Sequence, residues 1–266
     1  MKAGITAPRV PPFERIARAN GSFGYAADWS DSKHHYRRLA SEFIGTYGFV
    51  FALAGGAGAF HAYARPAPSN LLTVTLLTMV AAMWLVIAIY ALGDVSAHFN
   101  PAMTFAYALR GDMSWLRAVC YWLVQCGGAT AAALSARFFF GADSGLASIM
   151  PPPGAQVAAV FFEALLTGCF VLLVLGITRG PKLNGPFTPL AVGAFVLSFG
   201  TMGGLFDGAA FNPARALGPD VALGHFDLLW VYFVGDIAGA TLAVLGDFYF
   251  RGPADSREAS IAESEG

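Results

Sequence analysis

The residues best suited to chemistry in this chain lie in two copies of one tripeptide, Asn100-Pro101-Ala102 and Asn212-Pro213-Ala214. Their asparagines are 212 − 100 = 112 residues apart. An asparagine amide donates hydrogen bonds without carrying a charge, which suits brief contact with a neutral polar molecule. Arg215 follows the second copy directly and adds a fixed positive charge with several further donors.

Each tripeptide also predicts the start of a short helix. Asparagine is a strong N-cap, and proline is well placed at the first helical position, where its missing N–H is no loss. The segments that follow, Met103 to Ala108 and Arg215 to Leu217, are long enough only for short helices. Each helix presents the positive end of its dipole at its asparagine, so two inverted copies would place these ends opposite each other.

The composition places these motifs in a membrane protein. Of the 266 residues, 56% are hydrophobic and 12% are charged, and the mean hydropathy is +0.56. A soluble domain carries about 25% charged residues, so a core of this size could not hide so much apolar surface from water. Apolar runs long enough to cross a bilayer lie at about 41–60, 70–92, 114–138, 157–178, 187–206 and 227–250. The predicted fold class is an all-α membrane protein with six transmembrane helices, embedded in a lipid bilayer.

The composition also argues against other classes of protein. The net charge of −1 lacks the strongly basic face of a nucleic-acid-binding protein. The three cysteines lie within apolar runs and indicate small packing residues, not a disulfide framework. His98 has no second ligand at metal-binding spacing, so neither a metal nor a cofactor is predicted. An intramembrane enzyme would need a nucleophile–base pair or a metal cluster, whereas the histidines are scattered.

The charges of the connections predict an orientation. Basic residues are concentrated in the N-terminal tail, the second and fourth connections and the C-terminal tail, whereas the first connection has only Arg65. By the positive-inside tendency both termini are cytoplasmic, which requires an even number of spans. The predicted domains are a cytoplasmic tail at 1–40, a membrane domain at 41–250 and a second cytoplasmic tail at 251–266. The composition of both tails predicts disorder.

An internal repeat divides the membrane domain. Repeat one covers about 41–138 and repeat two about 157–250, and each holds three spans with its Asn-Pro-Ala between the second and third. Glu42 precedes Thr46 by four residues, as Glu163 precedes Thr167. An odd number of spans per repeat forces the two halves into opposite orientations. Inverted repeats with interrupted segments are typical of transport folds whose halves meet at the bilayer midplane.

The segments HFNPAMT and FNPARALGP, the two E-x-x-x-T pairs and YWLVQCGGA resemble the aquaporin, or major intrinsic protein, family. The resemblance covers roughly residues 40–250. It implies a right-handed six-span bundle with two re-entrant half-helices, assembled as a homotetramer with one pore per subunit. It also implies a passive channel in the plasma or inner membrane, not an enzyme.

The resemblance assigns roles to single residues. Asn100 and Asn212 would donate to the passing molecule, and the two dipole ends would repel cations, including protons. Arg215 would project into the outer pore. The remaining assigned residues would support the re-entrant loops, namely Glu42 and Glu163 as acceptors of backbone N–H groups, His98 as a brace, and Pro101 and Pro213 as helix starts.

Alignment without gaps on each Asn-Pro-Ala places the family's other constriction positions at Val80, Gly200 and Ala209. Water-selective members usually carry a large aromatic residue and a histidine at the first two. Val and Gly predict a wider opening, which admits glycerol, urea or undissociated metalloid acids together with water. Ala216 stands where typical glycerol channels have aspartate.

Two other functions remain as alternatives. One is a predominantly water-selective channel. The other is a proton-coupled secondary transporter with Glu42, Glu163 and Asp236 as its carboxylates. Asp236 occupies the place of a proline that is common in the family's last span. On the sequence alone, it faces a subunit contact, a water pocket or the rim of the pore.

Overall fold

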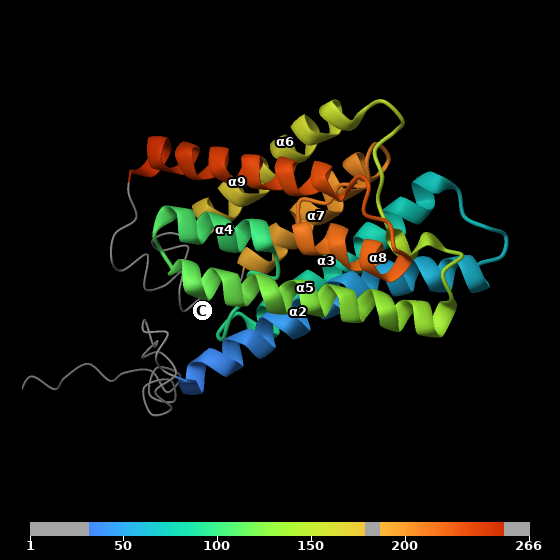
Figure 1. Cartoon of the computed structure of the whole chain (residues 1–266), viewed down its shortest axis with the longest axis horizontal. Helices are drawn as coiled ribbons and strands as arrows, with labels where there is room; N and C mark the ends of the chain where they lie inside the picture. The colour runs from blue at the N-terminus through green and yellow to red at the C-terminus, as the bar shows by residue number, and fades with distance from the viewer. Residues whose placement is uncertain (1–31, 179–186, 253–266) are drawn as a thin grey trace, which may run out of the picture.

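The computed structural model describes residues 32–178 and 187–252. Within these ranges the chain is all-helical, with eight α-helices and one short 3-10 turn, Gly145–Ala147. The helices are α2 (Ser32–Tyr63), α3 (Asn70–Leu92), α4 (Pro101–Arg110), α5 (Trp115–Phe140), α6 (Gln156–Ile177), α7 (Thr188–Gly204), α8 (Pro213–Leu223) and α9 (Leu229–Arg251). The long helices run roughly along one direction, and the short α4 and α8 lie between them (Figure 1).

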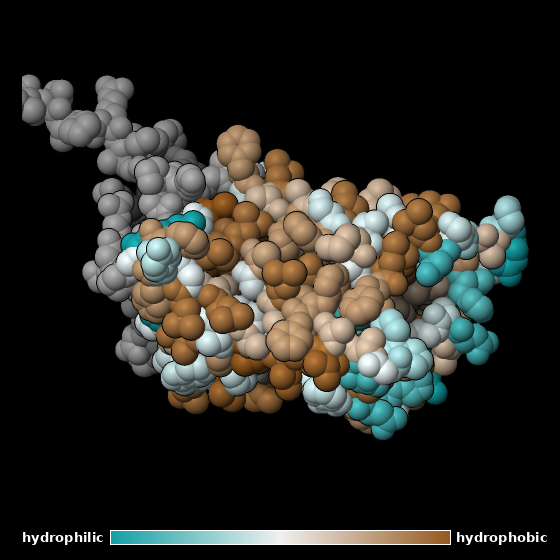
Figure 2. Space-filling model, turned by 90° about the horizontal axis from the view of Figure 1, so that it is seen from above, coloured by the Kyte–Doolittle hydropathy of each residue, from teal (hydrophilic) through white to brown (hydrophobic). Residues whose placement is uncertain are grey.

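Length and composition identify the spans. Five of the described helices, α2, α3, α5, α6 and α9, are long and apolar enough to cross a membrane. The sixth, α7, is apolar but has 17 described residues, which is about the minimum for a span. Hydrophobic side chains cover much of the face in Figure 2, and hydrophilic ones gather at one end. The all-α fold with two half-helices therefore agrees with the sequence prediction.

The start of the first span differs from the expectation. Helix α2 begins at Ser32, although the apolar run begins only at about residue 41. Its first turns carry polar and charged residues, and Tyr36 is 70% exposed. The predicted disorder at 1–31 and 253–266 lies outside the described residues.

The inverted repeat appears in the helix pairing. Helix α2 packs on α5, α6 packs on α9 in the same way, and α3 packs on α7 between them. A Cβ atom on Gly128 of α5 would lie 2.6 Å from the carbonyl oxygen of Phe43, and one on Gly239 of α9 would lie 2.3 Å from that of Ala164. Only glycine allows backbones to approach so closely. The two crossings are therefore equivalent, with offsets of 239 − 128 = 111 and 164 − 43 = 121 residues.

Both half-helices begin as predicted. Asn100 caps α4 with its side chain on Ala102 N, Asn212 caps α8 on Ala214 N and Arg215 N, and a proline follows each cap. Both are short, as predicted, but α8 extends beyond the segment that was assigned to it and continues through Pro219 to Leu223. Proline removes one helical hydrogen bond but does not prevent a helix that packing supports. Here Gly218 brings α8 against the backbone of Ala129 on α5.

Candidate functional site

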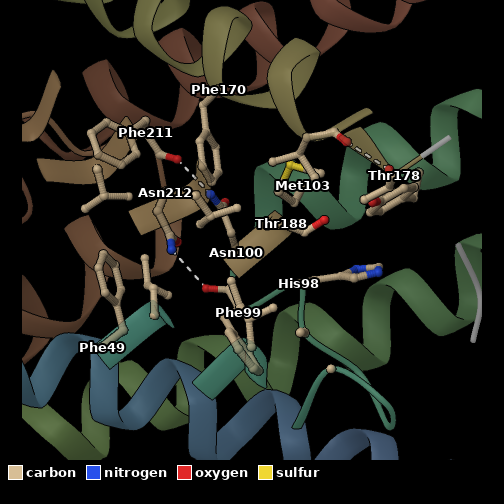
Figure 3. Close-up of a pocket in the computed structure, with 18 residues that line it drawn as sticks. Phe49, His98, Phe99, Asn100, Met103, Phe170, Thr178, Thr188, Phe211 and Asn212 are labelled. Carbon is tan, nitrogen blue, oxygen red and sulfur yellow. Dashed lines mark hydrogen bonds between the residues drawn. The ribbon is translucent and has the colours of Figure 1, made fainter. Parts of the chain in front are cut away.

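The two asparagines meet at the centre of the molecule. Asn100 Nδ2 donates to the carbonyl oxygen of Phe211 at 2.7 Å, and Asn212 Nδ2 donates to that of Phe99 at 2.9 Å. Figure 3 shows these reciprocal bonds between the two re-entrant segments. Because an amide NH2 has two hydrogens, each asparagine keeps one further donor hydrogen. Both side chains line one cavity, so these donors face a space that a solute can enter.

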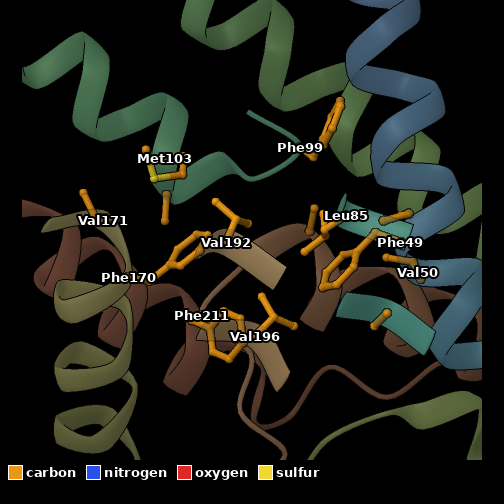
Figure 4. Packing of buried hydrophobic residues seen from close by; sticks show 14 of the residues in the cluster. Phe49, Val50, Leu85, Phe99, Met103, Phe170, Val171, Val192, Val196 and Phe211 are labelled. Atoms are coloured by element: carbon orange, nitrogen blue, oxygen red, sulfur yellow. The ribbon is translucent and has the colours of Figure 1, made fainter. Parts of the chain in front are cut away.

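Two cavities follow each other along the same helices. The first, about 70 Å³, is lined by the asparagines and by Leu85 of α3 and Val192 of α7. The second, about 280 Å³, is lined by Thr78 and Gly200, which lie about two turns away on the same two helices. The walls of the first are mainly apolar, as Figure 4 shows for Phe49, Leu85, Phe170, Val192, Val196 and Phe211. The two cavities therefore lie one after the other along α3 and α7, and the first has mainly apolar walls with the asparagine amides among them.

Arg215 lines the second cavity, one turn into α8. Its Nη1 donates to the carbonyl oxygen of Ala147 at 2.9 Å, and its Nη2 donates to that of Gly208 at 3.4 Å. The residue is 6% exposed, so its position is fixed by two backbone segments. A planar guanidinium held in this way presents a fixed charge and its remaining N–H groups to the cavity.

Glu42 holds the first re-entrant loop. Its two oxygens accept hydrogen bonds from four donors, namely Ser96 Oγ, His98 N, Phe99 N and Gln125 Nε2, at 2.6 to 2.8 Å. The side chain is fully buried. A carboxylate with this many donors is well compensated for its burial. The structure therefore gives Glu42 the supporting contacts that the family resemblance implies.

Glu163 holds the second re-entrant loop in the same manner. Its Oε1 accepts from Ala210 N at 2.6 Å, and its Oε2 accepts from Phe211 N at 2.8 Å.

His98 also contributes side-chain contacts to the first loop, because its Nδ1 is 3.0 Å from Thr104 Oγ1 and its ring packs on Tyr107. These contacts fix both loops beside the asparagines.

The structure brings only part of the predicted constriction together. Gly200 lines the second cavity with Arg215, but Val80 does not, and it lies beside Gly56 of α2. On α3 the cavity is lined by Val74, Leu77 and Thr78, and Val80 lies with Leu77 against Gly56 of α2. Val80 is absent from this lining in the described chain, and its place in the constriction stays a prediction.

Ala209 is also absent from the cavity lining, which holds its neighbour Gly208 instead. Ala209 is buried, with its Cβ close to Gly203 of α7. Its φ of 47° turns the loop so that the methyl group points into packing.

Three contributors were not predicted as site residues. Thr78 lines the second cavity, and its Oγ1 is 2.8 Å from Thr201 Oγ1. Ala147 supplies the carbonyl oxygen that accepts from Arg215. Gln125 donates hydrogen bonds to both Glu42 and Thr104. Gln125 lies three residues after Trp122, a spacing that places both on one helix face. No sequence signal identifies Ala147, because the contact uses its backbone.

The three carboxylic acids of the proton-coupled alternative lie outside both cavities. Glu42, Glu163 and Asp236 are fully buried and are absent from the lining of both cavities in the described chain. Asp236 accepts a hydrogen bond from Thr167 Oγ1 at 2.8 Å, so it faces α6 and neither a subunit surface nor the pore rim. A proton-coupled carrier needs its carboxyl groups on the solute path, and this arrangement does not supply them.

Comparison with known proteins agrees with this geometry. Residues 29–246 match the Major intrinsic protein family. The chain is 33% identical to Aquaporin NIP1-1 of Zea mays over 205 residues, 77% of this chain and 71% of that protein. It is 35% identical to Aquaporin TIP1-2 of Zea mays over 213 residues, 79% and 84% respectively. The structure of the aquaglyceroporin from Plasmodium falciparum shares the fold, with a TM-score of 0.69 at 22% identity over 81% of this chain and 96% of that one. The chain therefore belongs to the major intrinsic protein family, whose members are membrane channels for water and small solutes and not enzymes.

Proposed function

We propose that this channel passively conducts small uncharged solutes such as glycerol, urea or undissociated metalloid acids, together with water, and excludes ions and protons. The observation that carries the proposal is the space opposite Arg215. This space is the second cavity, called the mouth below. Its volume is about 280 Å³, and Gly200, Gly204 and Gly208 line it without contributing side chains. This volume is far more than a single water molecule requires.

The polar groups of the mouth favour hydroxyl-bearing or amide-bearing solutes. Arg215 supplies N–H donors, and the hydroxyl groups of Thr78 and Thr201 are nearby. The carbonyl oxygen of Gly208 accepts from Arg215 Nη2 at only 3.4 Å, which leaves acceptor capacity. Leu53 and Leu77 cover the other side of the same space and suit the carbon skeleton of a solute.

Ion exclusion follows from three positive elements in series. The N-termini of α4 and α8 point at each other across the asparagine pair, and each carries about half a positive charge. Arg215 adds a full charge at the wider mouth. A cation entering the path loses hydration and meets no carboxylate in the described lining.

The proposal extends to the setting of the channel. It places four copies together in the plasma or inner membrane, with both termini on the cytoplasmic side. The support is the family resemblance for the tetramer, and for the orientation the excess of basic residues at the ends of the chain.

Stopped-flow light scattering of proteoliposomes tests the solute class. We expect glycerol, urea and arsenite uptake well above that of empty liposomes, and water flux as well. Gly200→Leu should reduce solute uptake by about tenfold and water flux by less, because a Cβ there already lies 2.9 Å from Thr78 Cγ2 and a branched side chain fills the mouth.

Gly246→Leu is the matched control. Gly246 lies on α9 with its nearest neighbour 3.9 Å from a Cβ atom, so its variant should conduct as the native chain does. Val80→Leu should also leave uptake unchanged, because Val80 lies outside the mouth. Water flux without any solute uptake in the native chain would establish the water-selective alternative.

A further inference from the structure

The two halves differ at one position that supports the re-entrant loops. The α2–α5 and α6–α9 crossings are equivalent with an offset of 111 residues for α5 and α9. That offset places Asp236 at the position of Gln125, because 236 − 125 = 111. In repeat one Gln125 Nε2 donates to Glu42 Oε2 at 2.7 Å. Repeat two therefore has a carboxyl group where repeat one has an amide donor.

Asp236 occupies the same place in its half. The equivalence of the two crossings turns its carboxyl group toward Glu163, and its Oδ1 accepts from Thr167 Oγ1, one turn after Glu163 on α6, at 2.8 Å. Its Oδ2 is buried and receives no N–H or O–H donor among the described residues. Both carboxyl groups are fully buried. Two ionised carboxylates in such contact would repel without solvent to screen them, so one of them holds a proton.

The proton belongs on Asp236 because the two acids have different partners. Glu163 accepts two backbone N–H bonds, from Ala210 and Phe211, which favour its ionised form. Among the described residues, the hydroxyl of Thr167 is the only group that donates to Asp236. We propose that Asp236 is a positioning residue whose protonated carboxyl group donates a hydrogen bond to Glu163. This bond helps Glu163 to hold the second re-entrant loop, and it is lost in alkaline conditions.

The charged and titratable groups around Asp236 determine how its hydrogen bond to Glu163 depends on pH. They are Glu163 on α6, Asp207 in the loop before α8, Arg215 on α8 and Tyr232 on α9 itself. Helix α4 also packs on α9, but its Arg110 bonds Asp247 near the other end of α9. Support from Asp236 is present while it holds its proton and is lost as the pH rises. Its ionisation adds a negative charge beside Glu163 and Asp207, which loosens the loop that carries Asn212.

Water flux as a function of pH tests the proposal, and it rests only on channel activity and not on the choice of solute. Flux through the native chain should fall severalfold as the pH is raised from neutral into the alkaline range. Asp236→Asn should conduct equally at the lower pH and keep its flux at the higher, because its amide donates to Glu163 at every pH. Asp236→Ala removes the donor and should reduce flux at both.

Repeat one supplies the matched control. Adding Gln125→Glu to Asp236→Asn moves the carboxyl pair to Glu42 and should restore the alkaline loss of flux. Infrared difference spectra of the native chain against Asp236→Asn should show the carbonyl stretch of a protonated carboxylic acid in the native chain alone. Identical pH profiles for the native chain and Asp236→Asn, a missing carboxylic acid band, or an Asp236→Asn chain that does not fold would each overturn the proposal.

Discussion

At the scale of single residues, each central asparagine performs three tasks with one amide. The oxygen caps a half-helix, one N–H ties that half-helix to the opposite re-entrant segment, and the other N–H remains for a solute. The cross-links at 2.7 and 2.9 Å fix the spacing between the two helix starts. The donors are therefore aligned before a solute arrives, so no reorganisation is needed during passage.

Arg215→Ala should increase proton and cation leakage through the channel. Removing a unit charge that lines the second cavity lowers the barrier to a cation by about 2 kcal/mol at an effective dielectric constant of about 20, which corresponds to roughly thirty-fold. The measurement is the decay of an imposed pH gradient across proteoliposomes, followed with an internal dye. Arg215→Lys is the control, because it keeps the charge but cannot bond both Ala147 and Gly208. Equal background leakage in all three proteins would contradict the electrostatic role.

The residues that were predictable from sequence are those whose role depends on local chemistry. Asn100, Asn212 and Arg215 follow from the capping motif and its repetition, and each lines one of the two cavities in the described chain. Val80 stays a prediction, because its place relative to the cavity depends on how α3 is rotated, and local sequence does not fix that rotation. The contact of Asp236 depends on a helix crossing of α6 and α9 that no single span encodes.

At the scale of elements, the two re-entrant loops are strained segments held by buried acids. Phe99, Ala209 and Phe211 have φ values of 48°, 47° and 30°, and each such residue costs on the order of 1–3 kcal/mol. The same backbone lets the carbonyl oxygens of Phe99 and Phe211 accept from the asparagines. Glu42 and Glu163 offset this strain through charged hydrogen bonds to the loop amides.

Glu42→Ala should destabilise the protein by about 3–5 kcal/mol, because it removes the acceptor of four hydrogen bonds and leaves buried N–H groups unpaired. The thermal unfolding midpoint in detergent measures the change. Ser41→Ala is the smaller comparison, since it removes a single bond from Ser41 Oγ to Ser96 O in the same loop, and about 1 kcal/mol is expected. Similar midpoints for both variants would show that Glu42 is not the main anchor.

Element boundaries show where prediction from sequence ends. The six apolar runs identified the six long helices, because burial in lipid requires a long apolar segment. The length of α8 was underestimated because Pro219 indicates a helix end unless packing against α5 supports the helix beyond it. The offset between repeats is 121 residues for α2 and α6 but 111 for α5 and α9. Connections of unequal length therefore hide the equivalence of Gln125 and Asp236 from simple counting.

At the scale of the whole molecule, the inverted repeat makes the path similar in both directions while the surface charges do not. Arg110, Arg117 and Arg251 belong to one end of the helices, where the described chain also begins and ends in Figure 1. The opposite end holds the 3-10 turn, which contacts α2, α5 and α8. Passive flux depends on the concentration gradient alone, so this asymmetry serves insertion and not direction of transport.

The orientation can be tested with single cysteines on a background in which the native cysteines are replaced by serine. Tyr36 and Tyr249 are 70% and 86% exposed near the two described ends, whereas Asp143 is exposed in the connection between α5 and α6. Tyr36→Cys and Tyr249→Cys should react with a membrane-impermeant maleimide only in inside-out vesicles, and Asp143→Cys only in right-side-out vesicles. The reason is that an even number of spans returns the chain to its starting side, and the basic ends stay cytoplasmic. Labelling of Tyr36→Cys and Tyr249→Cys from opposite sides would require an odd number of spans, and labelling of both from outside would reverse the proposed orientation.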